Sequence, residues 1–537
     1  MRRTVKRVLS AVTGMLLATA IAVPAMAGDA YQTQFAGDGY SVASVEETTA
    51  GGKNPQRTAV SNVQSSGLFE SHLCVNGVDN STCQADAPGV QYEARQFLEP
   101  CLNATSENCI ESLEIIQRDG SSSKATLVET LKANPTLPAV PEQGLFESQG
   151  ISLYRDDSTT PSTLYAVSFW DYLSFDKQSR KWVTTNIDAS VYPYRVKEGS
   201  FSLPLIQDGV GSDGKPRLDD RADPNCDWND ATRCGIRQDF APGTRIRLSA
   251  RVAKTVSGWF RGRITKPDIT LNSFSATNNR ISVEGDVVEV ARMRAVLSPS
   301  TSSAEQQQAI IRQGGNGGNT VFHNEIKYPF ANWGDFAWVE LFRGLANDTA
   351  AGTSSVWTFS TLNGQSTNAC MSDTTRVLGM VTTNATMFNG NAPDFIDGML
   401  TYKVAGMHYL PDGKTLSEGT YDLLMRSDVA RCLYGFTSAP ISATISVIGA
   451  NGEEKTAVTT VNETKDGWLK LAAYGFTFSQ PTIKVRLTQQ EPATAVPTPT
   501  ATPVVTVVRK LIACVKGSSI RHVSGRSAKC PAGYRKK

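Results

Sequence analysis

The segment 245–252 reads Arg-Ile-Arg-Leu-Ser-Ala-Arg-Val, in which apolar side chains alternate with polar or charged ones. Successive side chains of a β-strand point to opposite faces of a sheet, so this alternation predicts a strand with one buried and one exposed face. Seven further segments predict strands in the same way. They are residues 164–169, 183–191, 281–290, 337–342, 356–362, 444–448 and 483–487.

Clusters of Gly, Asn, Asp and Pro separate these segments, for example at 208–214, 277–280, 389–394 and 450–453. A parallel α/β fold needs an amphipathic helix between successive strands, and most of the gaps are too short or too rich in turn residues for one. The sequence therefore predicts a mostly β protein with two antiparallel β-sandwich-like domains. A few short helices are expected at residues 91–99, 125–132 and 304–312, the last of them capped by Ser302 or Ser303.

Composition divides the remainder of the chain. A Gly/Asn-rich run at 314–319 places a helix and linker at 299–318, between an N-terminal β domain (28–298) and a C-terminal β domain (319–489). Residues 490–508 are rich in Pro and Thr, which predicts an extended spacer. The tail at 509–537 then holds nine Lys or Arg residues and no acidic residue.

The first 27 residues predict a secretory signal peptide. Arg2, Arg3, Lys6 and Arg7 precede an apolar run at 8–23, and small residues follow at Ala25 and Ala27. That order of basic, apolar and small residues is typical of an export signal that is cleaved, here after Ala27. No later segment is long and apolar enough for a spanning helix. We therefore expect a secreted, extracellular or cell-surface-associated protein without a transmembrane helix after cleavage.

The ten cysteines are expected to form five disulfides, because an even number in an exported chain is typical of disulfide bonding. Near neighbours give the pairs Cys74–Cys83, Cys101–Cys109, Cys226–Cys234, Cys370–Cys432 and Cys514–Cys530. Zinc is the competing hypothesis, but the chain has no C-x-x-C spacing.

The tail also carries a resemblance to known proteins. The segments Cys-Val-Lys-Gly (514–517) and Lys-Cys-Pro-Ala-Gly-Tyr-Arg-Lys-Lys (529–537) follow a Pro/Thr-rich spacer. This arrangement resembles a C-terminal module of uncharacterised secreted actinobacterial proteins. Two body segments are similar to the same group, Gly-Trp-Phe-Arg-Gly-Arg (258–263) and Arg-Ser-Asp-Val-Ala-Arg-Cys-Leu-Tyr-Gly-Phe (426–436). The resemblance implies a compartment and an architecture, and it implies no catalytic residues.

An acidic loop surrounds the Cys226–Cys234 ring. Its oxygen-bearing side chains are Asp219, Asp220, Asp223, Asp227, Asn229 and Asp230. Hard oxygen ligands at short spacing suit calcium, although the spacing does not fit an EF-hand. The alternative is a solvated loop in which Arg221 and Arg233 neutralise the acids.

No catalytic motif stands out. The chain has no G-x-S-x-G elbow. A catalytic triad could form around His72, His323 or His408, and two carboxylates could form a glycosidase pair. Recognising either one needs distances in space, which the sequence does not contain. The eight tryptophans could form a carbohydrate platform, but most lie within apolar alternations, which favours burial.

These observations favour a secreted, non-enzymatic cell-envelope or extracellular-matrix protein whose β domains present a binding surface. The formal net charge is only +2, so any electrostatic partner must bind a local patch. The cations Lys516, Arg521, Arg526, Lys529, Arg535, Lys536 and Lys537 would attach the tail to an anionic cell-wall polymer or glycan, or would only keep it soluble. Nucleic acid is not an expected partner of an exported protein. The rival hypotheses are a secreted glycan or ester hydrolase and a structural surface-assembly subunit.

Overall fold

The computed structural model describes most of the chain, and the structural statements below refer to the described residues. These are 41–45, 58–65, 68–74, 77–79, 90–132, 138–147, 149–202, 209–210, 216–217, 226–297, 303–305, 325–327, 330–331, 336, 339–340, 343–362, 366, 368–437, 441–448, 454–456, 460–463, 467–478, 482–489, 510–525 and 527–537.

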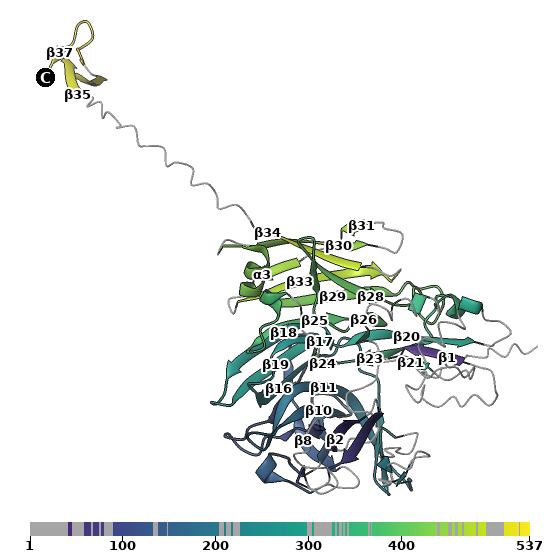
Figure 1. Ribbon diagram of the computed structural model, residues 1–537. Coiled ribbons are helices and arrows are strands. Elements are labelled where there is room, and N and C mark those ends of the chain that lie inside the picture. The colour runs from purple at the N-terminus through teal and green to yellow at the C-terminus, as the bar shows by residue number, and fades with distance from the viewer. Residues whose placement is uncertain are drawn as a thin grey trace, which may run out of the picture. The chain divides into compact units, whose positions relative to one another are not determined.

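The fold is mostly β, as the sequence predicts, and its largest sheet has 15 strands. Figure 1 labels many of the strands. The main path of this sheet runs in the order β3 (Leu68–Leu73), β2 (Thr58–Ser65), β4 (Val90–Phe97), β10 (Thr163–Asp176), β11 (Lys181–Glu198), β24 (Thr358–Thr361), β17 (Gly258–Arg263), β25 (Val377–Thr383), β29 (Glu418–Arg426), β33 (Trp468–Thr477) and β32 (Thr460–Glu463). Four more strands join it beside β10 and β11, namely β8 (Thr126–Lys132), β9 (Gln149–Asp156), β14 (Trp228–Asn229) and β15 (Arg233–Arg237).

A six-stranded sheet forms the second layer of the sandwich. It consists of β18 (Thr265–Ser273), β19 (Asn278–Asp286), β16 (Arg245–Ala253), β6 (Cys109–Ile116), β5 (Glu99–Pro100) and β7 (Ser122–Lys124). Ile246 and Leu248 of β16 share one buried cluster with Phe169 of β10 and Phe359 of β24. Because these residues come from the inner faces of two sheets, the sheets pack face to face as in a β-sandwich.

Smaller sheets complete the fold. A four-stranded sheet consists of β21 (Glu325–Lys327), β1 (Ser41–Val45), β20 (Val288–Leu297) and β23 (Gly352–Val356). A seven-stranded sheet consists of β22 (Phe330–Ala331), β26 (Met387–Asn389), β27 (Asp394–Ile396), β28 (Met399–Ala405), β34 (Thr482–Gln489), β30 (Ile441–Ile448) and β31 (Glu454–Thr456). The short strands β12 (Gly209–Val210) and β13 (Pro216–Arg217) pair with each other. The helical elements with defined bounds are α3 (Ser427–Tyr434) and the 3-10 turns η3 (Pro141–Gln143), η4 (Gly344–Ala346) and η5 (Ala369–Met371).

The strand pairing crosses the domain boundary that the sequence predicts at 299–318. β24, from the predicted C-terminal domain, lies between β11 and β17 of the predicted N-terminal domain. The chain divides into two compact units elsewhere: Met1–Thr437 with Ser442–Thr488, and Ser438–Ile441 with Gln489–Lys537. A separation at 299–318 would therefore have to break one continuous sheet.

Two of the three helix predictions are wrong, because residues 91–99 and 125–132 fall largely on strands β4 and β8. In β4 every second residue is buried from Val90 to Gln96, which is the two-residue period of a strand with one inward face. The third helix prediction covers 304–312. Ala304 and Glu305 are helical there, and residues 306–312 lie outside the described residues. The strand predicted at 337–342 is also wrong where it is described, since Val339 and Glu340 are helical.

Candidate functional site

The basic tail forms a three-stranded sheet in the order β36 (Ser519–Gly525), β35 (Lys510–Lys516) and β37 (Arg535–Lys536) (Figure 1). A two-residue turn, Gly517-Ser518, joins β35 to β36, since Lys516 pairs with Ser519. Gly517 has φ +59°, a left-handed conformation that glycine adopts without steric cost. The local sequence therefore closes a tight hairpin, and β37 pairs along its other side.

The pairing register defines two faces of this sheet, because residues directly opposite each other on paired strands share a face. The cysteine face carries Ile512, Cys514, Lys516, Ser519, Arg521, Val523 and Lys536. The open face carries Leu511, Ala513, Val515, Ile520, His522, Ser524 and Arg535.

The disulfide loop packs on the cysteine face. Cys514 is fully buried and is bonded to Cys530. The guanidinium of Arg521 lies 5.7 Å from the ring centroid of Tyr534, and a Cβ on Gly533 would lie 3.3 Å from Lys516 Nζ. The loop between Cys530 and β37 therefore covers the face from which Cys514 projects, and it leaves the opposite face uncovered within the tail.

The predicted attachment cations are exposed where they are described. These are Lys516, Arg521, Lys529, Arg535, Lys536 and Lys537, while Arg526 lies outside the described residues. Residues 509–537 contain no Asp or Glu, so they offer no carboxylate side chain to pair with these cations. Their combined potential is therefore available to an external anion.

The acidic loop is only partly described, and its described members have structural partners. The Asp227 carboxylate pairs with Arg237 at 2.7 Å and accepts a hydrogen bond from Tyr192 Oη at 3.1 Å. Asn229 is buried and donates to the backbone oxygen of Ser202 at 2.7 Å. Asp219, Asp220 and Asp223 lie outside the described residues.

Asp230 closes the turn before β15. It accepts hydrogen bonds from the backbone N–H groups of Thr232 and Arg233, and its carboxylate pairs with Arg233 Nε at 2.9 Å. Burial would raise the pKa of Asp230, but these hydrogen bonds outweigh burial and hold it below its ordinary value. Arg233 therefore pairs with Asp230, and the calcium hypothesis for the whole loop stays a prediction. No group of three His, Cys, Asp or Glu side chains suited to a metal ion occurs among the described residues.

Four predicted disulfides are confirmed: Cys101–Cys109, Cys226–Cys234, Cys370–Cys432 and Cys514–Cys530. Cys74 is disulfide-bonded as well, and Cys83, its predicted partner, lies outside the described residues.

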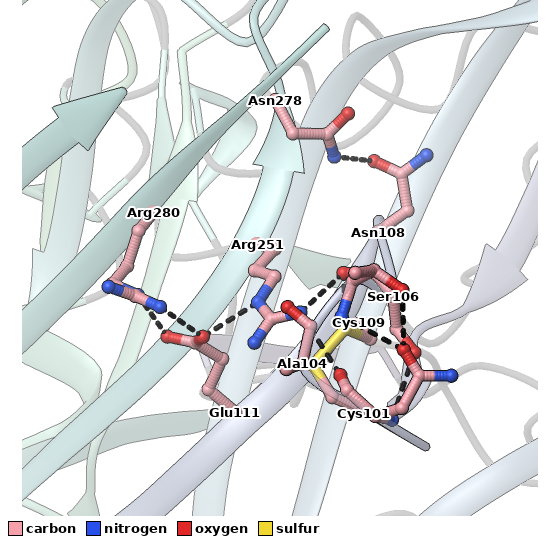
Figure 2. The surroundings of a disulfide bond; sticks show 11 residues. Cys101, Ala104, Ser106, Asn108, Cys109, Glu111, Arg251, Asn278 and Arg280 are labelled. Carbon is pink, nitrogen blue, oxygen red and sulfur yellow. Dashed lines mark hydrogen bonds and ion pairs between the residues drawn. A yellow bond between two sulfur atoms is a disulfide. The ribbon is translucent and has the colours of Figure 1, made fainter. Parts of the chain in front are cut away.

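The Cys101–Cys109 loop is held by a buried arginine that the sequence did not single out (Figure 2). Arg251 Nη1 donates to the backbone oxygens of Asn103, Ala104 and Ser106 at 3.2, 3.1 and 2.6 Å. Its Nε donates to Glu111 at 2.6 Å, and Arg280 binds the same carboxylate. Burial would raise the pKa of Glu111, but the hydrogen bonds from Arg280 and Arg251 hold it below its ordinary value. The disulfide and Arg251 thus both hold this loop, from which Leu102 projects with 87% of its surface exposed.

Six of the eight tryptophans are buried, which confirms the predicted burial for Trp170, Trp182, Trp228, Trp259, Trp357 and Trp468. Trp333 and Trp338 lie outside the described residues. The six buried rings cannot stack on a sugar at the surface of this fold.

His408 is the histidine whose side chain is described within the body. Its Nδ1 lies 3.6 Å from Asp348 Oδ2, and Asp348 Oδ1 accepts from the His408 backbone N–H at 2.9 Å. Arg343 also approaches this carboxylate, at 3.4 Å. The described contacts of His408 are thus with Asp348, and a triad around this histidine stays a prediction. Of the other two candidates, the side chain of His72 and all of His323 lie outside the described residues.

One carboxylate cluster at the surface was not predicted. Glu147 pairs with Lys132 at 3.4 Å, and both are near enough to Glu99 to affect its ionisation. Burial and the negative charge of Glu147 raise the pKa of Glu99, and Lys132 opposes the rise. The three residues lie far apart in the sequence, which is why no spacing pattern could have found them.

Two further carboxyl groups are buried inside the sheets. Burial raises the pKa of Asp171 to about 7, against the effect of hydrogen bonds from Thr184 and Gln96. Burial likewise raises the pKa of Asp422 to about 6, against hydrogen bonds from Tyr474 and Thr265. Neither group is exposed enough to contact a substrate, so both affect stability rather than binding.

Within the part of the chain that the structure describes, no helix is long and apolar enough to cross a membrane. Comparison of the whole chain with protein-family models, with curated proteins and with solved structures finds no match.

Proposed function

We propose that this chain is a secreted, non-enzymatic cell-envelope or extracellular-matrix protein, held near the cell by its basic tail. The tail would attach to anionic envelope polymers, and the β body would present the binding surface. The observation that carries the proposal is the exposed set of cations on a disulfide-closed sheet that has no acidic residue. The predicted signal peptide, the confirmed disulfides and the resemblance of the tail to modules of secreted proteins support the same compartment.

Deletion of residues 509–537 tests the attachment. The parent protein should divide between cells and medium in a salt-dependent manner, because cations on a surface bind polyanions less strongly as salt screens the charges. The deletion variant should be released at low salt. A matched control is Arg155→Gln, which removes an exposed cation from the body. Equal division of parent and deletion variant between cells and medium would disprove attachment through the tail.

The second candidate function is a secreted hydrolase, and the Glu99–Glu147 cluster is the observation that favours it. A carboxyl group with a raised pKa beside a second carboxylate is the arrangement that general acid catalysis uses in glycosidases. Glycan and ester substrates should be tested with the purified parent and with Glu99→Gln. Turnover that the Glu99→Gln change abolishes would replace the non-enzymatic proposal.

The assembly-subunit hypothesis predicts ordered polymers when the purified protein is sized.

A further inference from the structure

We infer that the open face of the tail sheet binds the surface of an anionic lipid bilayer. This inference rests on the proposed attachment function and names the ligand that the open face fits.

The apolar residues of the open face are unusually exposed. Leu511 retains 64% and Ile520 retains 50% of its surface accessible to solvent. Val515 is directly paired with Ile520 and lies on the same face as Leu511, four residues further along β35. Ala513 lies between Leu511 and Val515 on this face, so the apolar patch follows β35 and widens at Ile520. His522 and Ser524 border it on β36. Removal of these apolar side chains from water would be favourable.

The disulfide loop does not cover this patch, because the loop packs on the cysteine face. The disulfide between Cys514 and Cys530 places the loop on the cysteine face, where Cys514 is buried. A sheet of three short strands has only two faces, and one loop covers only one of them. The described residues of the tail thus leave the open face uncovered.

Cations border the apolar patch on the same face. Arg535 is directly paired with Val515, so Ile520, Val515 and Arg535 form one row across the three strands. Lys537 continues this edge, since its backbone N–H donates to the oxygen of Ala513 at 2.9 Å. Across two strand spacings, about 10 Å, the surface therefore changes from apolar to cationic.

An anionic bilayer matches both parts of this surface. Its acyl boundary accepts apolar side chains, while its headgroups attract Lys and Arg, whose long side chains can extend to the phosphates. A soluble polyanion would bind the cations of either face and would offer no apolar medium to Leu511 and Ile520. The combination on one face therefore suits a lipid surface, in addition to the polymers that the cations of either face can bind. Because the patch is small, binding should be reversible and weaker at high salt.

Sedimentation with vesicles tests the inference, using residues 28–537. Vesicles of equal parts phosphatidylglycerol and phosphatidylcholine should bind the protein, and vesicles of phosphatidylcholine alone should bind it far less. The double change Leu511→Ser with Ile520→Ser keeps every cation and should lower the affinity for anionic vesicles about tenfold. The matched control is Leu102→Ser, which removes a leucine that is 87% exposed in the body and should leave vesicle binding unchanged.

Binding of soluble polyphosphate by the same proteins separates this inference from the attachment function. The double serine variant should bind polyphosphate as the parent does, which shows that its cations remain available. Equal affinity of this variant and the parent for anionic vesicles would overturn the lipid inference. A parent that binds polyphosphate but no vesicles would overturn it too, and would leave attachment to polymers standing. A parent that binds neither probe would overturn both.

Discussion

Arg251 is a buried arginine that donates to three backbone carbonyl oxygens. Its guanidinium holds three carbonyl oxygens of the Cys101–Cys109 loop and the carboxylate of Glu111, while its side chain is only 8% exposed. A buried cation of this kind is retained because its partners replace the water that it lost.

Replacing this side chain should therefore be costly. Arg251→Met keeps most of the side chain's length but leaves three carbonyl oxygens and part of Glu111 without a donor, so we expect a loss of about 3 kcal/mol in the free energy of unfolding. Urea unfolding measures it. Arg155→Met is the control, since Arg155 is 48% exposed in a surface pair with Asp157 and its removal should cost less than about 1 kcal/mol. Similar losses for the two variants would contradict the bracing role of Arg251.

Asp171 should make stability depend on pH. Its pKa is about 7 in the folded protein, while an unfolded aspartate titrates near 3.8. Between these values the unfolded chain releases the proton and the folded protein keeps it, so this group lowers stability as the pH rises, by at most about 1.4 kcal/mol per pH unit. Above pH 7 its effect is constant.

The isosteric change Asp171→Asn should remove this slope. Urea unfolding of parent and variant at several values between pH 4 and pH 8 should show the variant gaining stability relative to the parent as the pH rises to 7. Asp157→Asn alters an exposed carboxylate and should track the parent within about 0.5 kcal/mol. A constant difference between parent and Asp171→Asn across this range would show that Asp171 is ionised in the folded state.

At the scale of elements, β25 pairs in parallel with β17, and a glycine of β25 lies opposite a tryptophan of β17. A Cβ on Gly379 would lie 2.3 Å from the ring of Trp259 and 2.6 Å from the backbone oxygen of Leu424. Trp259 is buried and donates from its indole nitrogen to the backbone oxygen of Met371 at 3.2 Å. The ring therefore cannot move aside without losing that hydrogen bond.

Gly379→Ala should separate these strands. We expect a loss of about 3 kcal/mol, near the upper end for overpacking of a core, with a loss of the near-ultraviolet circular dichroism of the tryptophans. Gly344→Ala is the matched control, because no atom lies within 4 Å of the added Cβ there. A Gly379→Ala protein as stable as the control would show that Trp259 and its neighbours accommodate the added methyl group, contrary to this prediction.

The strands could be predicted where the sequence alternates cleanly, as in β16, whose residues from Ile246 to Val252 face alternately inward and outward with one extra buried position. The errors have a physical cause. Residues 91–99 include Glu, Ala, Arg and Gln, which favour helices, but β4 forms ladders with β2 on one side and β10 on the other, and this tertiary pairing outweighs local propensity.

The candidate sites were predictable to a lesser extent. The charge of the tail is visible in its composition, and neighbouring cysteines suggested the pairs that the structure confirms. The two faces of the tail sheet depend on register, and the clusters around Arg251 and Glu99 bring together residues from distant strands. No local pattern records such contacts, because strand order is set by the packing of the whole sheet.

At the scale of the whole molecule, the Cys370–Cys432 disulfide closes the longest described loop. It joins η5 to α3 across 62 residues of sequence, whereas Cys226 and Cys234 are 8 apart. Chain entropy in the unfolded state predicts that the double change Cys370→Ala with Cys432→Ala costs about 4 kcal/mol, against about 2.5 kcal/mol for the Cys226 pair. Urea unfolding of both variants under oxidising conditions measures the difference. A smaller loss for the longer loop would show that strain or residual structure dominates over loop entropy.

The insertion of β24 between β11 and β17 has a consequence for how the protein is made. A ribosome delivers β11 and β17 well before Thr358–Thr361, so the growing chain holds two strands whose shared neighbour does not yet exist. Their facing edges stay open to wrong partners during that interval. Secretion in an unfolded form, with folding delayed until the last strand has crossed, would spare the cell this hazard.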